Sequence, residues 1–283
     1  MARILFILTV CIVVSTYSCS QIVFDQVDSI RCEQLLKRAH NENWSQKPIN
    51  EILILAGSDF IGTVYTGHTL ELAGEERLIV NLRELDCTTF IENMLVFARL
   101  IKKDKTLFSD YCTELQHVRY RNGIIAGYPS RLHYTSDWLF ENEKKGVVKN
   151  ITQELGGKPF LQKINFMTTH SESYKQLSNP VFVKQMQEIE TVINQRKYFY
   201  IPKQEIEAIE SKIRPGDIIG LATSVEGLDI THVGLAISRK GRIYFLHASP
   251  NKGVVVTAEP LVDYLNGIKK NVGIVIGRPM EVK

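Results

Sequence analysis

The chain has 283 residues, of which 44% are hydrophobic and 23% are charged, and its 34 Lys and Arg against 31 Asp and Glu give a formal charge of +3. This ordinary globular composition excludes collagen-like, low-complexity and intrinsically disordered chains, because no long segment lacks apolar residues. The small basic excess forms no concentrated stripe, so we expect no nucleic-acid partner. The length suffices for one large domain or two small ones.

Residues 1–20 have the pattern of a secretory signal. Their apolar run, Ile4 to Val14, has 11 residues, well short of the roughly 20 that a membrane-spanning helix needs. Cleavage before Gln21 gives a secreted protein, whereas Cys19 after Thr16-Tyr-Ser18 also fits a lipoprotein signal that attaches lipid to this cysteine. We therefore expect an exported protein, located in the periplasm or at the outer membrane or cell surface as a lipoprotein.

Removal of the signal leaves three cysteines, an odd number: Cys32, Cys87 and Cys112. In an oxidising compartment Cys32 and Cys112 can pair and leave Cys87 as a free thiol, although the sequence does not establish this connectivity. The alternative for any of the three is a small buried apolar residue.

Apolar residues at helical spacing predict helices at about 27–39, 49–55 and 87–102. Before the third helix, Thr69–Glu71 and Leu78–Leu82 have the pattern of two strands of a hairpin joined at Gly74. Asp86 is the candidate N-cap of the third helix, and the lysines at its other end suit a helix C-terminus. The hairpin and the cap together place Cys87 at the start of an amphipathic helix.

The next segment, about 106–211, has a mainly helical pattern with irregular, aromatic-rich connections. Ser136 is a candidate cap of one helix, and Asn179-Pro180 a candidate start of another. The C-terminal part changes to short β-rich runs that predict an antiparallel meander, with a helix at 260–268 before the last strand; the strands are expected at 217–222, 231–238, 242–247, 253–257 and 271–276. Without internal repeats or a low-complexity linker, a single α+β domain over residues 21–283 is favoured.

Cys87 has the setting of an activated nucleophile, because free N–H groups and the helix dipole at a helix N-terminus favour a thiolate. A cysteine nucleophile also needs an imidazole that accepts and returns a proton. His232 and His247 are separated by 15 residues with a turn at Gly241 between them, so two antiparallel strands can place their rings side by side. One ring would act as the base and the other would orient it. For each histidine alone, the alternative is a solvated or hydrogen-bonded strand residue.

Four motifs follow one another in a specific order: Leu85-Asp-Cys-Thr-Thr-Phe90, Arg214-Pro-Gly-Asp-Ile218, Thr231-His-Val-Gly-Leu-Ala-Ile237 and His247-Ala-Ser249. In this order they resemble the NlpC-type cell-wall amidases. Within that superfamily, the N-acetylmuramoyl-L-alanine amidase-like branch resembles this chain in Phe60–Tyr65, Ser130–Tyr134 with Asp137-Trp138, and Asn165–Met167 with His170. The resemblance implies an α+β fold with a circularly permuted papain-like core, in which the helix bearing the cysteine packs on an antiparallel sheet. It also implies a large, mainly helical insertion at about 104–213.

Carried onto this chain, the resemblance implies that Cys87 is the nucleophile, that His232 is the general base and then the acid, and that His247 orients His232. Tyr65 matches a tyrosine that helps to form the oxyanion site with the Cys87 amide, where negative charge develops during attack. Aromatic rings stack on sugars and an arginine can bind a carboxylate, so we expect four residues near the sugar or peptide: Arg131, His133, Tyr134 and Trp138. Alternatively, Arg131 and His133 hold an irregular loop in place.

The expected substrates are peptidoglycan fragments, cut at the amide between N-acetylmuramic acid and L-alanine, with anhydromuramyl peptides preferred on resemblance alone. Thr88-Thr89 stands where the superfamily usually has Ser-Gly, which disfavours but leaves open an endopeptidase that cuts between D-glutamate and the diamino acid. A non-catalytic wall-binding module is the third interpretation. We expect a monomer and no metal or organic cofactor. A zinc amidase built on His133, His170, His232 and His247 would leave the position of Cys87 unexplained.

Overall fold

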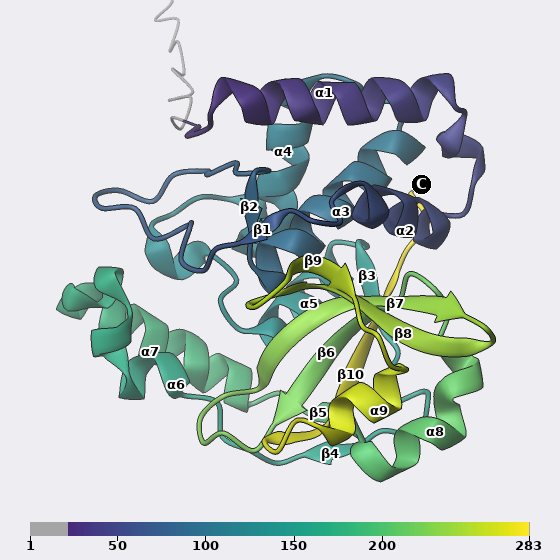
Figure 1. Cartoon of the computed structure of the whole chain (residues 1–283). Helices are drawn as coiled ribbons and strands as arrows, with labels where there is room; N and C mark the ends of the chain where they lie inside the picture. Colours follow the sequence, from purple (N-terminus) through teal and green to yellow (C-terminus); the bar gives the residue numbers. More distant parts are fainter. Residues whose placement is uncertain (1–21, 283) are drawn as a thin grey trace, which may run out of the picture.

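The structure is a computed structural model that describes residues 22–282. In these residues the main sheet has eight strands, and every neighbouring pair is antiparallel (Figure 1). The order is β4-β5-β10-β6-β7-β8-β9, and β3 pairs with β10. The strands are β3 (Val148–Asn150), β4 (Lys158–Phe160), β5 (Tyr198–Pro202), β6 (Ile218–Thr223), β7 (Ile230–Arg239), β8 (Arg242–Ser249), β9 (Gly253–Val256) and β10 (Asn271–Pro279).

Helices cover the sheet on both sides. In Figure 1, the first four lie together above the sheet, α8 and α9 lie below it, and α6 and α7 project to one side. Within residues 22–282, none of the helices combines the length and the apolarity needed to cross a bilayer. Their bounds are α1 (Gln26–Asn41), α2 (Ile49–Asp59), α3 (Cys87–Lys102), α4 (Phe108–Arg119), α5 (Thr135–Lys144), α6 (Phe166–Thr169), α7 (Pro180–Asn194), α8 (Ile206–Ile209) and α9 (Leu261–Asn266).

Alternate residues of the central strands pack into different cores. Leu235 of β7 pairs with Leu246 of β8, and both belong to the larger core, which is shared with α1–α4. Ala236 and Phe245 form the next pair in register and belong to the smaller core with the apolar side chains of α9. Since successive strand side chains point to opposite faces, one sheet supports both cores.

Helix α3 begins where the sequence predicts it, and a capping box fixes its start. The Asp86 side chain accepts from the Thr89 amide at 2.7 Å, and the Thr89 hydroxyl oxygen accepts from the Asp86 amide at 2.9 Å. This exchange satisfies two backbone donors that a helix start would otherwise leave free. The helix is buried along most of its length, and a buried ion pair joins its Glu92 to Arg119 of α4 at 2.6 Å. Cys87, the first residue of α3, is therefore held at a defined point.

The predicted hairpin of Thr69–Glu71 and Leu78–Leu82 is wrong. The two short strands of this region are β1 (Val64–Tyr65) and β2 (Glu84–Leu85), and they pair in parallel. Ile79 instead forms a parallel bridge with Val23. Gly74 does turn the chain, with a φ of +92° that favours glycine. The alternation of apolar residues marked segments that are extended or buried, but it did not identify their partners.

The C-terminal strands are confirmed, whereas their simple meander order is wrong at the last step. β10 does not lie beside β9 but crosses back to β6. Every residue of β6 is buried, as expected for a strand with a neighbour on each edge, and β7 and β10 are those neighbours. The segment 104–213 is also less helical than expected, because β3, β4 and β5 join the main sheet. These strands have three to five residues each, too few for a clear alternation.

The predicted start of α7 is confirmed, whereas the predicted cap of α5 and the suggested disulfide are absent from the described residues. Helix α7 starts at Pro180 with Asn179 as its N-cap, as predicted. Ser136 does not cap α5, because its amide donates to Asp229 Oδ2 at 2.7 Å from within the first turn. Among residues 22–282, Cys32, Cys87 and Cys112 are all free, so the structure does not contain the suggested disulfide. The secretory signal and Cys19 lie outside the described residues.

Candidate active site

Tyr65 and Cys87 lie close together because β1 and β2 pair. The register places Tyr65 beside Leu85, two residues before Cys87 at the start of α3. Burial raises the pKa of the half-buried Tyr65 hydroxyl, and the neighbouring Cys87 and Asp86 raise it further. Tyr65 is consequently a neutral donor at neutral pH, beside the cysteine.

His232 and His247 form a hydrogen-bonded pair across β7 and β8. His232 Nε2 lies 2.6 Å from His247 Nδ1, and the rings are almost perpendicular, at 89°. The His247 ring also stacks on Phe245 at 4.8 Å, and Tyr264 of α9 contacts its edge at 5.5 Å. His247 is therefore held from three sides, and its nitrogen fixes the ring of His232.

Cys87 lies next to β7, at the residue that follows His232. The Val233 backbone and Thr88 lie close enough to the Cys87 sulfur to stabilise its charged form, and Val233 directly follows His232. Within the described residues, no hydrogen bond joins the Cys87 sulfur to His232, whose Nε2 is occupied by His247. The nitrogen of His232 that is free to meet the thiol is Nδ1. Catalytic hydrogen bonds often tighten only when substrate binds.

The Cys87 thiol is not the activated thiolate that its helix position predicts. Burial, and then the adjacent Asp86 carboxylate, raise the pKa of Cys87 to about 11. These effects outweigh the stabilising contacts with Val233 and Thr88. Removal of a thiolate from water is costly even near a helix dipole. The resting group at neutral pH is thus the protonated thiol.

Both histidines are neutral at neutral pH. Burial, and then the neighbouring His247, lower the pKa of His232 to about 3. Burial lowers the pKa of His247 to about 4. When the His232 Nε2–H donates to His247 Nδ1, Nδ1 of His232 is an unprotonated base. A neutral thiol and a neutral imidazole are the components of general-base catalysis rather than of a preformed ion pair.

A cavity of about 240 Å³ lies beside the start of α3. Tyr65, Thr88 and His133 line it, together with acidic and basic groups of neighbouring segments. Its acidic groups are already engaged: Asp86 caps α3, Glu92 pairs with Arg119, and Glu71 pairs with Arg131. The cavity therefore combines hydroxyl, imidazole and backbone groups next to the cysteine with no free strong charge.

His133 has a defined protonation state at this cavity. Its Nε2 lies 2.9 Å from the Tyr128 carbonyl oxygen, which can only accept, so Nε2 carries the proton. Burial, and then the neighbouring Arg131, lower the pKa of His133 to about 3. The ring is consequently neutral and its Nδ1 is an unprotonated acceptor. Of the four expected substrate-binding residues, His133 lies in the best position for contact with a ligand.

The other three expected substrate-binding residues are more deeply placed. The buried Arg131 side chain donates to Glu71 at 2.5 Å and to the Leu70 carbonyl at 3.1 Å, although Arg131 also lines the cavity. Tyr134 is buried, its hydroxyl donates to Glu190 at 2.7 Å, and it does not line the cavity beside the start of α3. Trp138 is buried beside a narrow cavity of about 20 Å³ under Thr88. Arg131 holds the loop, as the alternative interpretation expected, and the structure does not bring Tyr134 to the cavity.

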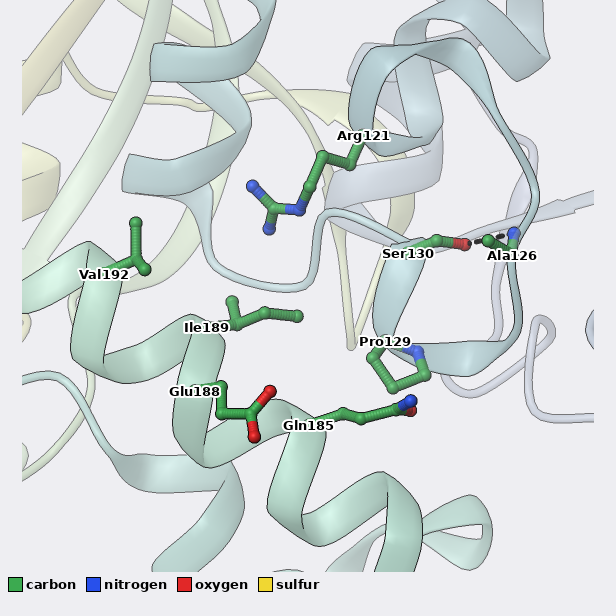
Figure 2. Close-up of a pocket in the computed structure, with 8 residues that line it drawn as sticks. All are labelled: Arg121, Ala126, Pro129, Ser130, Gln185, Glu188, Ile189 and Val192. Atoms are coloured by element: carbon green, nitrogen blue, oxygen red, sulfur yellow. Dashed lines mark hydrogen bonds between the residues drawn. The ribbon is translucent and has the colours of Figure 1, made fainter.

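A separate cavity of about 400 Å³ lies on the other side of the loop that carries Arg131 (Figure 2). Figure 2 shows α7 on one side of it, with Ile189 and Val192, and on the other side the loop, where Ser130 Oγ accepts from the Ala126 amide. Arg121, at the start of the same segment, extends toward the cavity, and its guanidinium pairs with Asp137 of α5. None of the residues expected to take part in catalysis lines this cavity.

The residues that support the histidine pair were not predicted from the sequence. Gly234 lies opposite His247, and a Cβ there would come within 2.6 Å of the Phe245 ring and 2.8 Å of His247 Cβ. The glycine in Thr231-His-Val-Gly234 therefore gives His247 the room that it needs. Tyr264 lies on α9, which follows β9 in the chain, so no local sequence pattern connects it with the histidine pair.

The structure does not assemble the alternative zinc site. His170 stacks on Phe166 at 4.2 Å, whereas His133 packs against Tyr128. In the described part of the chain, no group of three or more His, Cys, Asp or Glu side chains has the spacing to hold a metal ion. Of the four histidines considered for zinc, His232 and His247 are the pair that meets.

Comparison with known proteins identifies the family of this chain. Residues 55–274 match the N-acetylmuramoyl-L-alanine amidase-like (AmiA-like) family, whereas no curated protein matches the chain in sequence. An N-acetylmuramoyl-L-alanine amidase from Bacteroides uniformis has a similar structure, with a TM-score of 0.77 and 34% identity over 82% of this chain and 98% of its own. A Bacteroides fragilis protein described as a candidate xylanase has a TM-score of 0.75 and 37% identity, over 79% of this chain and 99% of its own.

A Legionella pneumophila protein shares the fold alone, with a TM-score of 0.66 and 22% identity over 90% of this chain and 96% of its own. The family match extends over most of the chain and includes Tyr65, Cys87 and both histidines of the pair. The chain belongs to the N-acetylmuramoyl-L-alanine amidase-like family.

Proposed function

We propose that the protein is a cysteine amidase that hydrolyses the amide between N-acetylmuramic acid and L-alanine in peptidoglycan fragments. The observation that carries this proposal is the arrangement around Cys87: it lies at a helix start with the neutral Tyr65 hydroxyl beside it, and its sulfur is close to Val233, the neighbour of His232 in the hydrogen-bonded pair of His232 and His247 on β7 and β8. This combination contains a nucleophile, an oxyanion donor and an oriented base.

The reaction begins with the neutral thiol. As the Cys87 sulfur attacks the lactyl carbonyl carbon, its proton passes to Nδ1 of His232, which comes within hydrogen-bond distance in the substrate complex. The carbon–nitrogen bond then breaks, and His232 returns the proton to the departing L-alanine nitrogen. A water molecule, deprotonated by His232, attacks the thioester and releases the muramyl acid and the thiol.

Two groups stabilise the negative oxygen that forms during attack. The Tyr65 hydroxyl is a neutral donor, and the Cys87 backbone N–H is free of an intrahelical partner because it lies at the first position of α3. His247 stabilises the imidazolium of His232 by accepting from its Nε2–H. The residues of this mechanism supply nucleophilic, acid–base and electrostatic catalysis, and we infer that it needs no metal or organic cofactor.

We assign the cavity of about 240 Å³ to the sugar and the first residue of the stem peptide. The unprotonated Nδ1 of His133 would accept from an N–H or O–H of the substrate. Thr88, in place of the usual serine, suits an acylated L-alanine nitrogen better than a free amine. An anhydromuramyl peptide is the preferred substrate in this proposal.

A xylanase function, suggested by the description of the Bacteroides fragilis protein, fits the site less well. Glycosidases need two carboxyl groups on either side of the bond, one ionised and one protonated. The carboxylates at the cavity instead serve a helix cap and two ion pairs with arginines. They are therefore not free to act as this acid and base.

We also infer, from the resemblance of the four motifs, that the core is a circularly permuted papain-like one, in which the helix with Cys87 packs on β7. We further propose that the protein is a monomer and that it is exported. Its single domain contains a family-specific insertion at residues 104–213. The alternatives remain a stem-peptide endopeptidase, which uses the same nucleophile, and a wall-binding module, which uses none.

Mass spectrometry of the products tests the proposed function. The mature protein is incubated with a disaccharide anhydromuramyl tripeptide and, separately, with the free tripeptide, with Cys87→Ala as the control. Release of intact tripeptide from the first substrate alone, abolished in Cys87→Ala, supports the amidase. Cleavage within the free tripeptide identifies the endopeptidase, and binding without any product identifies the wall-binding module.

A further inference from the structure

Large apolar side chains are exposed at one corner of the molecule, where α1 and α4 begin. Phe24, Val27 and Ile30 are 47%, 53% and 47% exposed, and Leu107, just before α4, is 57% exposed. The Phe24 ring packs on Phe108 at 4.8 Å, which connects the starts of the two helices. We call Phe24, Val27, Ile30 and Leu107 the apolar corner. Clustered exposed apolar residues of this kind mark interaction surfaces.

The folded part of the chain begins directly beside this corner. The Val23 amide donates to the Leu78 carbonyl, and the Val23 carbonyl accepts from the Val80 amide, both at 2.9 Å. Asp25 and Asp28 then close a capping box at the start of α1. Val23 is therefore fixed to the body of the protein on one side and leads into a defined helix on the other.

The distance from this fixed point to the candidate lipid-attachment residue is short. Cys19 precedes Val23 by four residues, and four residues span at most about 14 Å even when fully extended. Amphipathic surfaces bury their apolar face roughly 5–10 Å into the boundary between headgroups and acyl chains. A lipid on Cys19 would thus hold the apolar corner within reach of the membrane.

We propose that Cys19 is lipidated and that the apolar corner lies on the lipid surface. Acyl chains on Cys19 would attach the protein to the bilayer, and the apolar corner provides additional apolar contact that determines which face of the protein meets the lipid. Charge does not provide this contact, because the nearby Arg83 is paired with Asp25 and Asp28. We therefore infer that the apolar corner contacts the boundary between headgroups and acyl chains of the bilayer. This inference does not depend on which bond the enzyme cuts.

The test uses the full chain, made in a bacterium that processes lipoproteins, and begins with the mass of its N-terminal peptide. A diacylglyceryl group on Cys19, absent in Cys19→Ser, is expected. An unmodified N-terminus at Gln21 would overturn the proposal. Neither result depends on hydrolytic activity.

Contact with the bilayer is then measured with an environment-sensitive fluorophore on Val27→Cys or Leu107→Cys, in a Cys87→Ala background. Val192→Cys on α7 is the matched control, because Val192 is similarly exposed, at 49%. In phosphatidylcholine–phosphatidylglycerol vesicles, probes at 27 and 107 should shift to shorter wavelength and be quenched by spin-labelled lipid, unlike the probe at 192. Equal quenching at all positions, or none at 27 and 107, would overturn the proposal. A blue shift that depends on protein concentration and not on lipid would show that the apolar corner contacts a second copy of the chain, and would overturn the proposal.

Discussion

His232 Nε2 lies 2.6 Å from His247 Nδ1 although the two residues are not opposite each other in the sheet. The ladder pairs Leu235 with Leu246, so its continuation places His247 opposite Gly234 and diagonal to His232. Diagonal neighbours on one face are within reach of long side chains. The missing side chain at Gly234 leaves the space through which the two rings meet.

Gly234→Ala should therefore reduce catalysis more than stability. The added Cβ would come within 2.8 Å of His247 Cβ and 2.6 Å of the Phe245 ring, and such overpacking costs about 1–3 kcal/mol. Gly277→Ala is the matched control, because its Cβ would meet Leu139 at 2.7 Å on β10. Thermal unfolding and kcat are measured for both variants. Similar melting temperatures with a lower kcat only in Gly234→Ala support the role of Gly234, whereas equal kcat values contradict it.

His247 should act as a positioning residue that affects kcat and leaves KM nearly unchanged. We expect His247→Ala to reduce kcat by about 10²–10⁴-fold, as loss of the orienting member does in other catalytic triads. His247→Asn can still accept a hydrogen bond from His232 and should recover part of this loss. A higher KM with unchanged kcat in both variants would instead place His247 in substrate binding.

The pKa of Cys87 predicts how fast its thiol is alkylated. Only the thiolate reacts, and a pKa of about 11 means that its fraction rises about tenfold per pH unit from pH 7 to pH 10. The rate of carboxamidomethylation of the Cys87 peptide should follow this rise without a plateau. His232→Ala should leave the profile unchanged, since the resting state has no ion pair. A plateau below pH 8 that disappears in His232→Ala would demonstrate a thiolate–imidazolium pair.

Acid should destabilise the fold through its buried histidines. The pKa values of His133, His232 and His247 are lowered to about 3, 3 and 4, below the 6.5 of an unfolded histidine. As the pH falls below 6.5, the unfolded chain binds protons that the folded chain rejects, so the free energy of unfolding decreases by up to about 1.4 kcal/mol per pH unit for each group. Stability is thus highest above pH 6.5 and decreases toward pH 4.

Urea unfolding at pH 7.0, 5.5 and 4.5 measures this dependence. His133→Gln should decrease the pH slope of the unfolding free energy by about one proton's contribution. An unchanged slope in His133→Gln would show that folded and unfolded His133 bind the proton equally well, which would contradict the lowered pKa.

Arg131 should contribute more to stability than to substrate affinity. Its guanidinium is 6% exposed and pairs with Glu71 at 2.5 Å and Glu76 at 3.5 Å. Arg131→Met leaves both carboxylates without this partner, and removal of one member of a buried pair costs about 3–5 kcal/mol. We expect a much lower melting temperature, with KM nearly unchanged where the protein remains folded. A normal melting temperature with a raised KM would restore Arg131 as a ligand-binding residue.

The sequence predicted those parts of the site that depend on local patterns. Asp86 caps α3 and places Cys87 at its start, and the turn between β7 and β8 brings His232 and His247 together, because capping and hairpin pairing involve neighbouring residues. The segments Phe60–Tyr65, Ser130–Tyr134 and Asn165–Met167 also identified the amidase-like family. These are interactions within one element or between adjacent elements.

The features that could not be predicted depend on contacts between distant segments. The pairing of β1 with β2, and of β10 with β6, is decided by packing against the whole core rather than by local alternation. The high pKa of Cys87 likewise results from burial, which the helix position alone does not reveal. Arg131 was expected at a substrate carboxylate, but Glu71, sixty residues earlier, occupies its guanidinium.

The most direct test of the account is the mass of the acyl group that Cys87 carries during turnover. The enzyme is mixed with a disaccharide anhydromuramyl tripeptide, quenched with acid within one turnover, and digested for mass spectrometry of the Cys87 peptide. The account predicts a thioester with the muramyl lactyl group and its sugar, without peptide, and no adduct in Cys87→Ala. An adduct that contains L-alanine and D-glutamate, or hydrolysis in Cys87→Ala, would contradict it.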